Sequence, residues 1–304
     1  MARAAPGAGA DHRDSHDSRR TLPQRPLDFP EPPWHIAAMR KRAEIALAVL
    51  LLGVIGVIGW QALRVQDIEP VVAGRPLTQW VENYVNGAPG KSTEEADRAL
   101  REAGTNAIPV LLRMLREKES PFRRQMMGLL RMQKVVQVHY TPVERRNQAA
   151  YFAFLRLGGS GTGAELAVPQ LMEIYQERIS PFARQCAAMS LGAYGPAARS
   201  AIPVLLRGLA DTNVLVRCDT LNGLGHIRAD PELVVPALAK ALNDPVPKVR
   251  LFACMALSQQ AQEAKPAAPA LAKALNDSDS GVRFMAANAL KAIDPEAAAR
   301  AGVK

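Results

Sequence analysis

The sequence predicts an all-α protein, in which an α-solenoid of about five to six helix pairs follows one transmembrane helix. Three observations support this fold class. The nine residues PALAKALND occur at 236–244 and again at 269–277, an arginine recurs with the same period, and a single long apolar run lies near the N-terminus. The chain has 304 residues, of which 48% are hydrophobic and 22% charged, so it can bury a sizeable core.

Residues 39–63 are predicted to anchor the chain in a membrane. The stretch 43–63 has one ionisable group, Glu44 at its edge, and a helix of that length spans about 31 Å, which matches a bilayer core. No polar face interrupts the run, which argues against a buried soluble helix. A cleaved signal peptide is the alternative, but residues 60–63, WQAL, make a poor small-x-small cleavage site. We therefore expect an uncleaved signal-anchor.

The charges beside this run predict its orientation. Residues 40–42 are Arg-Lys-Arg, whereas Arg64, Asp67 and Glu69 follow the run, so the positive-inside rule puts the N-terminus in the cytoplasm. We expect a single-pass protein of the cell (inner) membrane, with the residues from about 64 onward outside the cytoplasm. Residues 1–38 lack hydrophobic periodicity and are predicted to be a disordered tail. Translation from Met39 is an alternative start.

Residues 64–91 are predicted to be a linker and an N-terminal capping helix. Thr78 can cap the start of a short helix, and Trp80 and Tyr84, four residues apart, fall on one face of it. The end of a solenoid exposes apolar surface that must be covered. This helix is therefore expected to cover the first repeat.

Two markers keep one period in the second half of the chain. Prolines that follow an apolar residue stand at positions 169, 203, 236 and 269, so their spacing is nearly constant. The second marker is an arginine that recurs at a constant interval, at Arg184, Arg217, Arg250 and Arg283. The interval is the one that separates the two PALAKALND segments. A repeat with a period of about 20–50 residues is typical of solenoids.

The sequence pattern of each unit predicts two short helices joined by a polar turn. In one unit, PVLLRGL at 203–209 has apolar residues at helical spacing, ADTN at 210–213 breaks the pattern, and VRCDTLNGLGHI at 216–227 resumes it. The proline is expected in the first helical turn, where no amide bond is lost. On the second helices a small residue recurs three places after the arginine, and a leucine seven places after it, which predicts close packing between neighbouring helices.

The units resemble HEAT repeats of the short bacterial type, also called lyase-like HEAT repeats after the phycobilisome lyases. The resemblance rests on the apolar-Pro start, the Asp at the turn and the Val-Arg-x-x-Ala opening of the second helix. It covers about 92–294, with regular repeats at 164–294 and a C-terminal tail at 295–304. Ankyrin repeats share the period, but their TPLH-like turn is missing, as is the Trp-Gly-Tyr signature of tetratricopeptide repeats. The resemblance implies an armadillo-type α-solenoid and leaves the function open.

In that family the turn Asp and the helix Arg form a ladder of hydrogen bonds between adjacent repeats. The resemblance assigns this structural ladder to Asp211, Arg217, Asp244, Arg250, Asp277 and Arg283, where each Arg follows its Asp by six residues. Upstream, Arg184 and Arg124 keep the arginine, but Arg178 and Lys118 stand six residues before them. The ladder is therefore expected to be less regular in the first half.

Residues 92–163 are predicted to form irregular, basic HEAT-like repeats. Pro109 and Pro169 lie almost two repeat periods apart, so either two units are compressed or one carries an insertion, and GGSGTG at 158–163 reads as a linker. Residues 98–146 contain eleven Lys or Arg and four acidic residues, a surplus that attracts acidic partners. This candidate basic patch comprises Arg113, Arg116, Arg123, Arg124, Arg131, Lys134, Arg145 and Arg146.

The second helices are expected to line the concave side of the solenoid and to bind a protein partner. Positions one, two, five and eight residues after each arginine should face outward and include Phe and Met, which suit a groove for a helix or an extended segment. The alternative is that several of them pack between helices. The candidate partner-binding residues are Gln185, Met189, Asp219, Asn222, Phe252, Met255, Phe284 and Asn288.

The sequence contains no motif of a known catalytic or metal site. Three cysteines without a CxxC pair are expected to be buried hydrophobic residues. We therefore predict a non-enzymatic scaffold without a cofactor that is anchored in the membrane and binds a protein partner. The alternatives are an enzyme or enzyme subunit of the bilin-lyase type, which only the repeat family implies, and a module that binds anionic lipid or an envelope polymer. An extracytoplasmic location disfavours nucleic acid as a partner.

Overall fold

The computed structural model describes residues 41–42, 44–45, 69–87, 90–121, 125 and 141–303. The chain divides into two compact units, Met1–Gln66 and Asp67–Lys304, and all elements named below belong to the second. Within the described residues no helix is long and apolar enough to cross a membrane. The predicted tail and, apart from positions 41–42 and 44–45, the predicted anchor lie outside the described residues.

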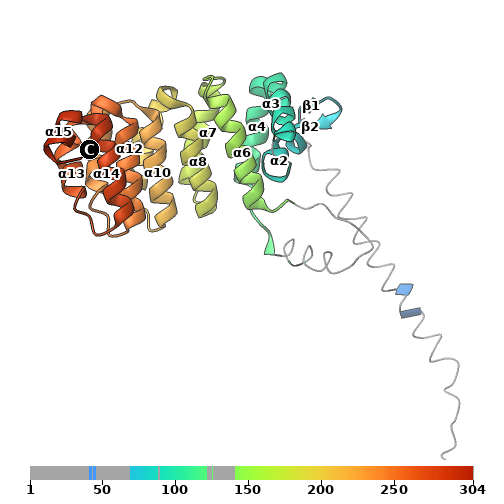
Figure 1. The fold of residues 1–304 in the computed structure, drawn as a ribbon. Coiled ribbons are helices and arrows are strands. Elements are labelled where there is room, and N and C mark those ends of the chain that lie inside the picture. The colour runs from blue at the N-terminus through green and yellow to red at the C-terminus, as the bar shows by residue number, and fades with distance from the viewer. Residues whose placement is uncertain are drawn as a thin grey trace, which may run out of the picture. The chain divides into compact units, whose positions relative to one another are not determined.

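The described residues of the second unit lie mostly in helices (Figure 1). It begins with two short antiparallel strands, β1 (Val71–Val72) and β2 (Arg75–Pro76). The helices of its N-terminal part are α2 (Leu77–Asn86), α3 (Lys91–Ala103), η1 (Gly104–Asn106), α4 (Ala107–Arg116) and α6 (Val143–Gly158). The remaining helices are α7 (Ala164–Gln176), α8 (Pro181–Ala193), η2 (Gly195–Ala201), α9 (Ile202–Gly208), α10 (Val214–Ile227), α11 (Pro231–Ala241), α12 (Pro247–Gln259), η3 (Ala261–Ala267), α13 (Ala268–Ala274), α14 (Ser280–Ile293) and α15 (Pro295–Arg300).

The helices form two rows, so the predicted solenoid of helix pairs is confirmed. The second helices α6, α8, α10, α12 and α14 each pack against the next one along the chain (Figure 1). The first helices α4, α7, α9, α11 and α13 form the other row, and each packs against the second helix of its own unit. The units thus contact mainly their neighbours in sequence, as in other solenoids.

A repeated pair of positions on the second helices fills the core. The leucine seven places after the repeated arginine and the small residue three places after it are fully buried in every regular unit. These residues are Leu191, Leu224, Leu257 and Leu290, together with Ala187, Thr220, Ala253 and Ala286. The expected packing face of the second helices is therefore present.

The helices α8 and α10 approach each other more closely than side chains would allow. A Cβ atom on Gly192 would lie 2.9 Å from the Cα of Gly223, and one on Gly223 would lie 2.6 Å from the carbonyl oxygen of Ala188. Real Cβ atoms essentially never come this close to backbone atoms. The two glycines therefore set the spacing between these units.

The irregular first half contains one unit with a long connection. The helix α4 packs against α6, so residues 117–142 join the two helices of a single unit, and 122–124 and 126–140 lie outside the description. In α6, Ala150 and Phe154 are fully buried and occupy the places of the small residue and the leucine. This alignment puts Asn147 at the position where the later second helices have the repeated arginine. Arg124, which the sequence pattern suggested for that position, lies outside the described residues.

The helix α2 closes the N-terminal part much as expected, but its start differs. The side chains of Trp80 and Tyr84 pack against the core, where Trp80 Nε1 donates to the Val72 carbonyl at 2.9 Å and the Tyr84 hydroxyl donates to Asp97 at 2.6 Å. The expectation that Thr78 caps this helix is wrong. Pro76 occupies the cap position, and the Thr78 backbone amide and hydroxyl instead donate to Glu69.

Two further expectations need correction. The prolines at 169 and 236 lie inside α7 and α11, because these helices begin five residues earlier, at Ala164 and Pro231. In addition, the predicted C-terminal tail contains α15, whose first turn is capped by the side chain of Asp294. Ala298 on α15 is almost fully buried, and α15 packs against α14.

We expect Gly223→Ala to destabilise the protein by about 1–3 kcal/mol, because the new methyl group has to displace the backbone of α8. Alanine would otherwise favour a helix interior by about 1 kcal/mol. Urea unfolding followed by circular dichroism measures the change. Gly159→Ala is the matched control, because its Cβ would lie 3.5 Å from the nearest atom, and it should leave the stability unchanged or slightly raised. Equal effects of the two substitutions would contradict the close contact.

Candidate protein-interaction surface

The ladder arginines reach forward to the next unit. Arg217 donates to both carboxylate oxygens of Asp244, from Nε at 3.0 Å and from Nη2 at 3.1 Å. Arg250 repeats this bidentate pair with Asp277, at 2.7 and 2.6 Å. A planar guanidinium fits a carboxylate in this geometry. Each pair joins residues that are 27 positions apart and therefore belong to adjacent units.

The same side chains also fix the turns of their own units. Arg217 Nη1 donates to the carbonyl oxygen of Asp211 at 2.8 Å, and Arg250 Nη1 to that of Asp244 at 3.0 Å. The Asp244 carboxylate accepts from the backbone amide of Val246 at 2.9 Å. The six-residue spacing noted in the sequence thus corresponds to a bond with the aspartate's carbonyl group, while the carboxylate serves the preceding unit.

The two ends of the ladder differ. Arg184 donates to the Asp211 carboxylate and, from Nε at 3.0 Å, to the Tyr175 carbonyl, so the ladder begins with a residue that lacks an aspartate six places before it. Arg283 donates to the carbonyl oxygens of Asp277 and Ser278 at 2.7 and 3.1 Å. Within the described part of the chain it contacts no carboxylate.

Electrostatics favour the ionised forms of two ladder aspartates, Asp211 and Asp277. The hydrogen bond from Arg250 outweighs burial and lowers the pKa of Asp277. Burial alone would raise the pKa of Asp211, but the amide of Asn213 and the guanidinium of Arg184 stabilise its carboxylate and hold that pKa below its ordinary value. The ladder therefore contributes to stability when its aspartates are charged.

The second-helix surface, defined as the eight candidate partner-binding residues, is only partly exposed. Gln185 is buried, and Phe252 is half-buried and packs against the core. Phe284 is 66% exposed and Asn288 is also exposed. The remaining members are half-buried: Met189, Asp219, Asn222 and Met255. The surface is therefore most open on α14.

Asp219 is a half-buried carboxyl group in the middle of this surface. It makes no hydrogen bond or ion pair with any residue that the structure describes. Burial raises its pKa to about 6, although Lys248 acts in the opposite direction. Since a buried unpaired carboxylate is unfavourable, this group has an unused capacity to accept a charged hydrogen bond.

Sequence analysis missed the contribution of α6 to the same row of helices. Tyr151 and Phe152 lie on α6 with ring centroids 5.3 Å apart, and both are half-buried. Burial raises the pKa of Tyr151 to about 12, with further contributions from Cys186 and Asp219. Alignment on the arginine could not find these residues, because α6 has Asn147 in that place.

The described members of the candidate basic patch mostly have partners. Arg113 pairs with Glu69 at 3.2 Å, and Arg116 pairs with Glu173 at 2.9 Å. Arg146 pairs with Glu82 and Glu117 at 2.9 and 2.5 Å, and Arg145 donates to the carbonyl oxygen of Val85 at 3.1 Å. These partners come from α2, α7 and the segments before α2 and after α4. The other members lie outside the described residues: Arg123, Arg124, Arg131 and Lys134.

The cysteines are buried, as expected. Burial raises the pKa of Cys218 to about 11 and that of Cys254 to about 12, and it raises the pKa of Cys186 as well. All three are therefore thiols at neutral pH, and thiolate is the reactive form. In the part of the chain that the structure describes, no group of three or more His, Cys, Asp or Glu could hold a metal ion.

Replacement of a ladder arginine should destabilise the protein. We expect Arg250→Ala to cost about 1–3 kcal/mol of unfolding free energy, because it leaves the mostly buried Asp277 without its charged donor. Arg199→Ala is the control, since Arg199 forms an ion pair with Asp230 while its own side chain is 70% exposed, and its effect should be clearly smaller. Urea unfolding measures both, and equal losses would contradict a structural role of the ladder.

The effect of Arg250→Ala should depend on pH. The pKa of Asp277 in the folded protein lies below the unfolded value of about 3.9, so the stabilisation is fully present above that value and is lost as the pH falls through the folded pKa. The difference between the original protein and the variant should therefore be constant from pH 7 to about pH 5 and shrink below about pH 4.

Comparison with known proteins agrees with the repeat geometry. Residues 202–273 and 235–301 match the family model for HEAT repeats. No curated protein sequence matches the chain.

Among solved structures, an engineered protein is 17% identical, with 74% of this chain and 97% of that chain covered and a TM-score of 0.40. The complex of CpcE and CpcF of phycocyanin lyase from Nostoc sp. PCC7120 is 22% identical, with 77% and 84% covered and a TM-score of 0.41. Kap121p bound to Pho4p is 16% identical, with 74% and 26% covered and a TM-score of 0.49. Residues 202–301 are therefore similar in sequence to HEAT repeats, and their helices are paired as in a solenoid.

Proposed function

We propose that this chain is a membrane-anchored scaffold that holds a HEAT-repeat solenoid outside the cytoplasm and binds a protein partner through its second-helix surface. The observation that carries this proposal is Phe284, a large aromatic side chain that is 66% exposed on α14. Half-buried Phe252 and Met255 lie on α12, which packs against α14. Apolar side chains on adjacent helices of a solenoid supply the contact area that a partner helix or extended segment needs.

Asp219 gives the same surface an acidic group that a partner would have to pair. Its carboxyl group has no hydrogen-bond partner among the described residues, and it lies on α10, next to α12. A Lys or Arg of the partner would provide the missing charged donor. We therefore expect the partner segment to combine apolar residues with a basic one.

The membrane part of the proposal rests on the sequence. The apolar run at 43–63 and the basic residues at 40–42 support a single span with the N-terminus in the cytoplasm. The binding role, as opposed to catalysis, is supported by the lack of a catalytic motif in the sequence. We do not adopt the lipid-binding alternative, because the described arginines of the basic patch contact carboxylates or a carbonyl oxygen.

Site-specific photo-crosslinking tests the binding surface. A photoreactive phenylalanine analogue at position 284 should give a discrete crosslinked product in intact cells, because this side chain would lie in the interface. The matched control is position 233 on α11, where Leu233 is also exposed, at 54%, but belongs to the row of first helices. Mass spectrometry of the product identifies the partner. Identical products from both positions, or none from position 284, would argue against the proposed surface.

Membrane fractionation tests the anchor. The full chain should remain in the membrane fraction after an alkaline carbonate wash, because a hydrophobic span of about 20 residues is not extracted by high pH. A variant without residues 39–63 should be recovered in the soluble fraction. Protease added to spheroplasts should digest the solenoid of the full chain. Release of the full chain by carbonate would overturn the anchor and leave the binding surface untouched.

A further inference from the structure

The ladder is interrupted at one junction, where both of its partners are replaced. In the last three regular units an aspartate stands six residues before the repeated arginine, but Arg178 stands six residues before Arg184. In the preceding unit Asn147 takes the place of the arginine, and its side-chain amide donates to the Met114 carbonyl at 2.6 Å. A site for an anionic side chain in the regular units thus carries a cation here.

Arg178 is held in an uncommon backbone conformation. It follows the end of α7 with a φ of 51°, in the left-handed region where glycine or asparagine usually ends a helix. Such strain in a bulky residue often accompanies a functional role. The conformation alone does not identify one, but the surroundings of the side chain do.

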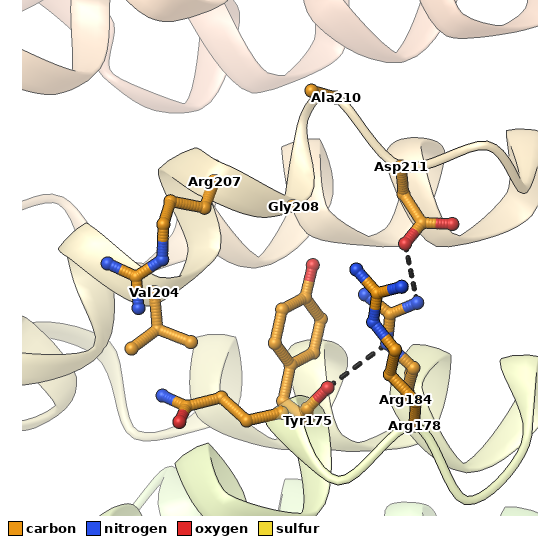
Figure 2. A pocket seen from close by; sticks show the side chains of 9 residues that line it. Tyr175, Arg178, Arg184, Val204, Arg207, Gly208, Ala210 and Asp211 are labelled. Carbon is orange, nitrogen blue, oxygen red and sulfur yellow. Dashed lines mark hydrogen bonds and ion pairs between the residues drawn. The ribbon is translucent and has the colours of Figure 1, made fainter.

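Arg178 lines a pocket of about 300 Å³ between the end of α7, the helix α8 and the helix α9 with its following turn (Figure 2). Tyr175 forms its inner wall: its side chain is almost fully buried, and its hydroxyl lies 2.6 Å from that of Thr220. Gly208 makes room for this ring, because a Cβ atom there would lie 1.7 Å from the Tyr175 hydroxyl. The pocket is lined by Tyr175, Gln176, Arg178, Arg184, Val204, Arg207, Gly208, Ala210 and Asp211.

The charges in this pocket do not balance. Arg184 and Asp211 neutralise each other, and the Asp211 carboxylate also accepts from the amide of Asn213 at 2.8 Å. Arg178 and Arg207 are exposed, and neither makes a hydrogen bond or ion pair with any residue that the structure describes. Figure 2 shows their side chains on opposite sides of Tyr175. Two guanidinium groups are therefore available to a ligand.

We propose that this pocket binds an oxyanion, a phosphate or carboxylate group, through the guanidinium groups of Arg178 and Arg207 that line it. Guanidinium groups bind both kinds of oxyanion with paired, charge-assisted hydrogen bonds. A volume of about 300 Å³ admits a small molecule or a single anionic group. The pocket lies at the ends of α7 and α9 in the row of first helices, so this site is independent of the proposed partner surface.

Calorimetric titration of the full chain with inorganic phosphate and, separately, with succinate tests the site. The double variant Arg178→Gln and Arg207→Gln should weaken binding by about tenfold or more, because it removes both free cations. Arg228→Gln is the matched control: Arg228 is also an exposed arginine with a positive φ, of 49°, after the end of a helix, and it lies outside the pocket. Binding of phosphate alone would identify a phosphate site, and binding of succinate as well would extend it to carboxylates.

A second measurement uses the unaltered chain and does not depend on the folding of a variant. Phenylglyoxal modifies exposed arginines, and mass spectrometry of peptides gives the rate at each residue. Saturating phosphate or succinate should slow the modification of Arg178 and Arg207 severalfold and leave Arg228 unchanged. The proposal is overturned if neither anion binds, if the double variant binds as well as the original chain, or if the rates at Arg178 and Arg207 do not change.

Discussion

Successive second helices pack so closely that their spacing determines where every other group of the solenoid can lie. At the contact between α8 and α10, Gly192 and Gly223 bring the two backbones together. At this distance Arg184 donates a hydrogen bond to Asp211 in the next unit. Arg217 and Arg250 make the equivalent bonds to the units that follow them. The small buried residues on these helices are therefore as important to the ladder as the charged residues that form it.

A single ladder aspartate both joins adjacent units and fixes the turn of its own unit. Its carboxylate accepts both from the arginine of the preceding unit and from a backbone amide in its own turn, as Asp244 does from Arg217 and Val246. The turn shape and the contact between units are thus coupled. Where the aspartate is replaced, at Arg178, the turn has a different, left-handed geometry, and the local charge is reversed.

The regular units could be predicted from the sequence because each one has the same pattern of buried and ladder residues. The constant period, the buried leucines such as Leu224, and the ladder residues all follow from a pattern that recurs along the chain. The irregular unit could not be predicted in this way. Asn147 replaces the arginine on which the alignment rests, and the long connection 117–142 shifts α6 out of phase, so Tyr151 and its neighbours escaped notice.

Exposure was the least predictable property of the candidate surface. The spacing along a helix predicts which way a side chain points, but neighbouring helices decide how much of it remains uncovered. Gln185 and Phe284 both lie one place after a repeated arginine, yet Gln185 is buried and Phe284 is largely exposed.

The forward direction of the ladder has a consequence for how such an array can change in length. Arg184, Arg217 and Arg250 each bond to an aspartate 27 positions ahead, and the interval from one repeated arginine to the next is constant. Removing or duplicating one whole unit inside the array therefore keeps the 27-residue spacing of the remaining pairs, whereas a change of length between an arginine and its aspartate alters it. The identical PALAKALND segments are what a chain that grows by copying complete units would carry.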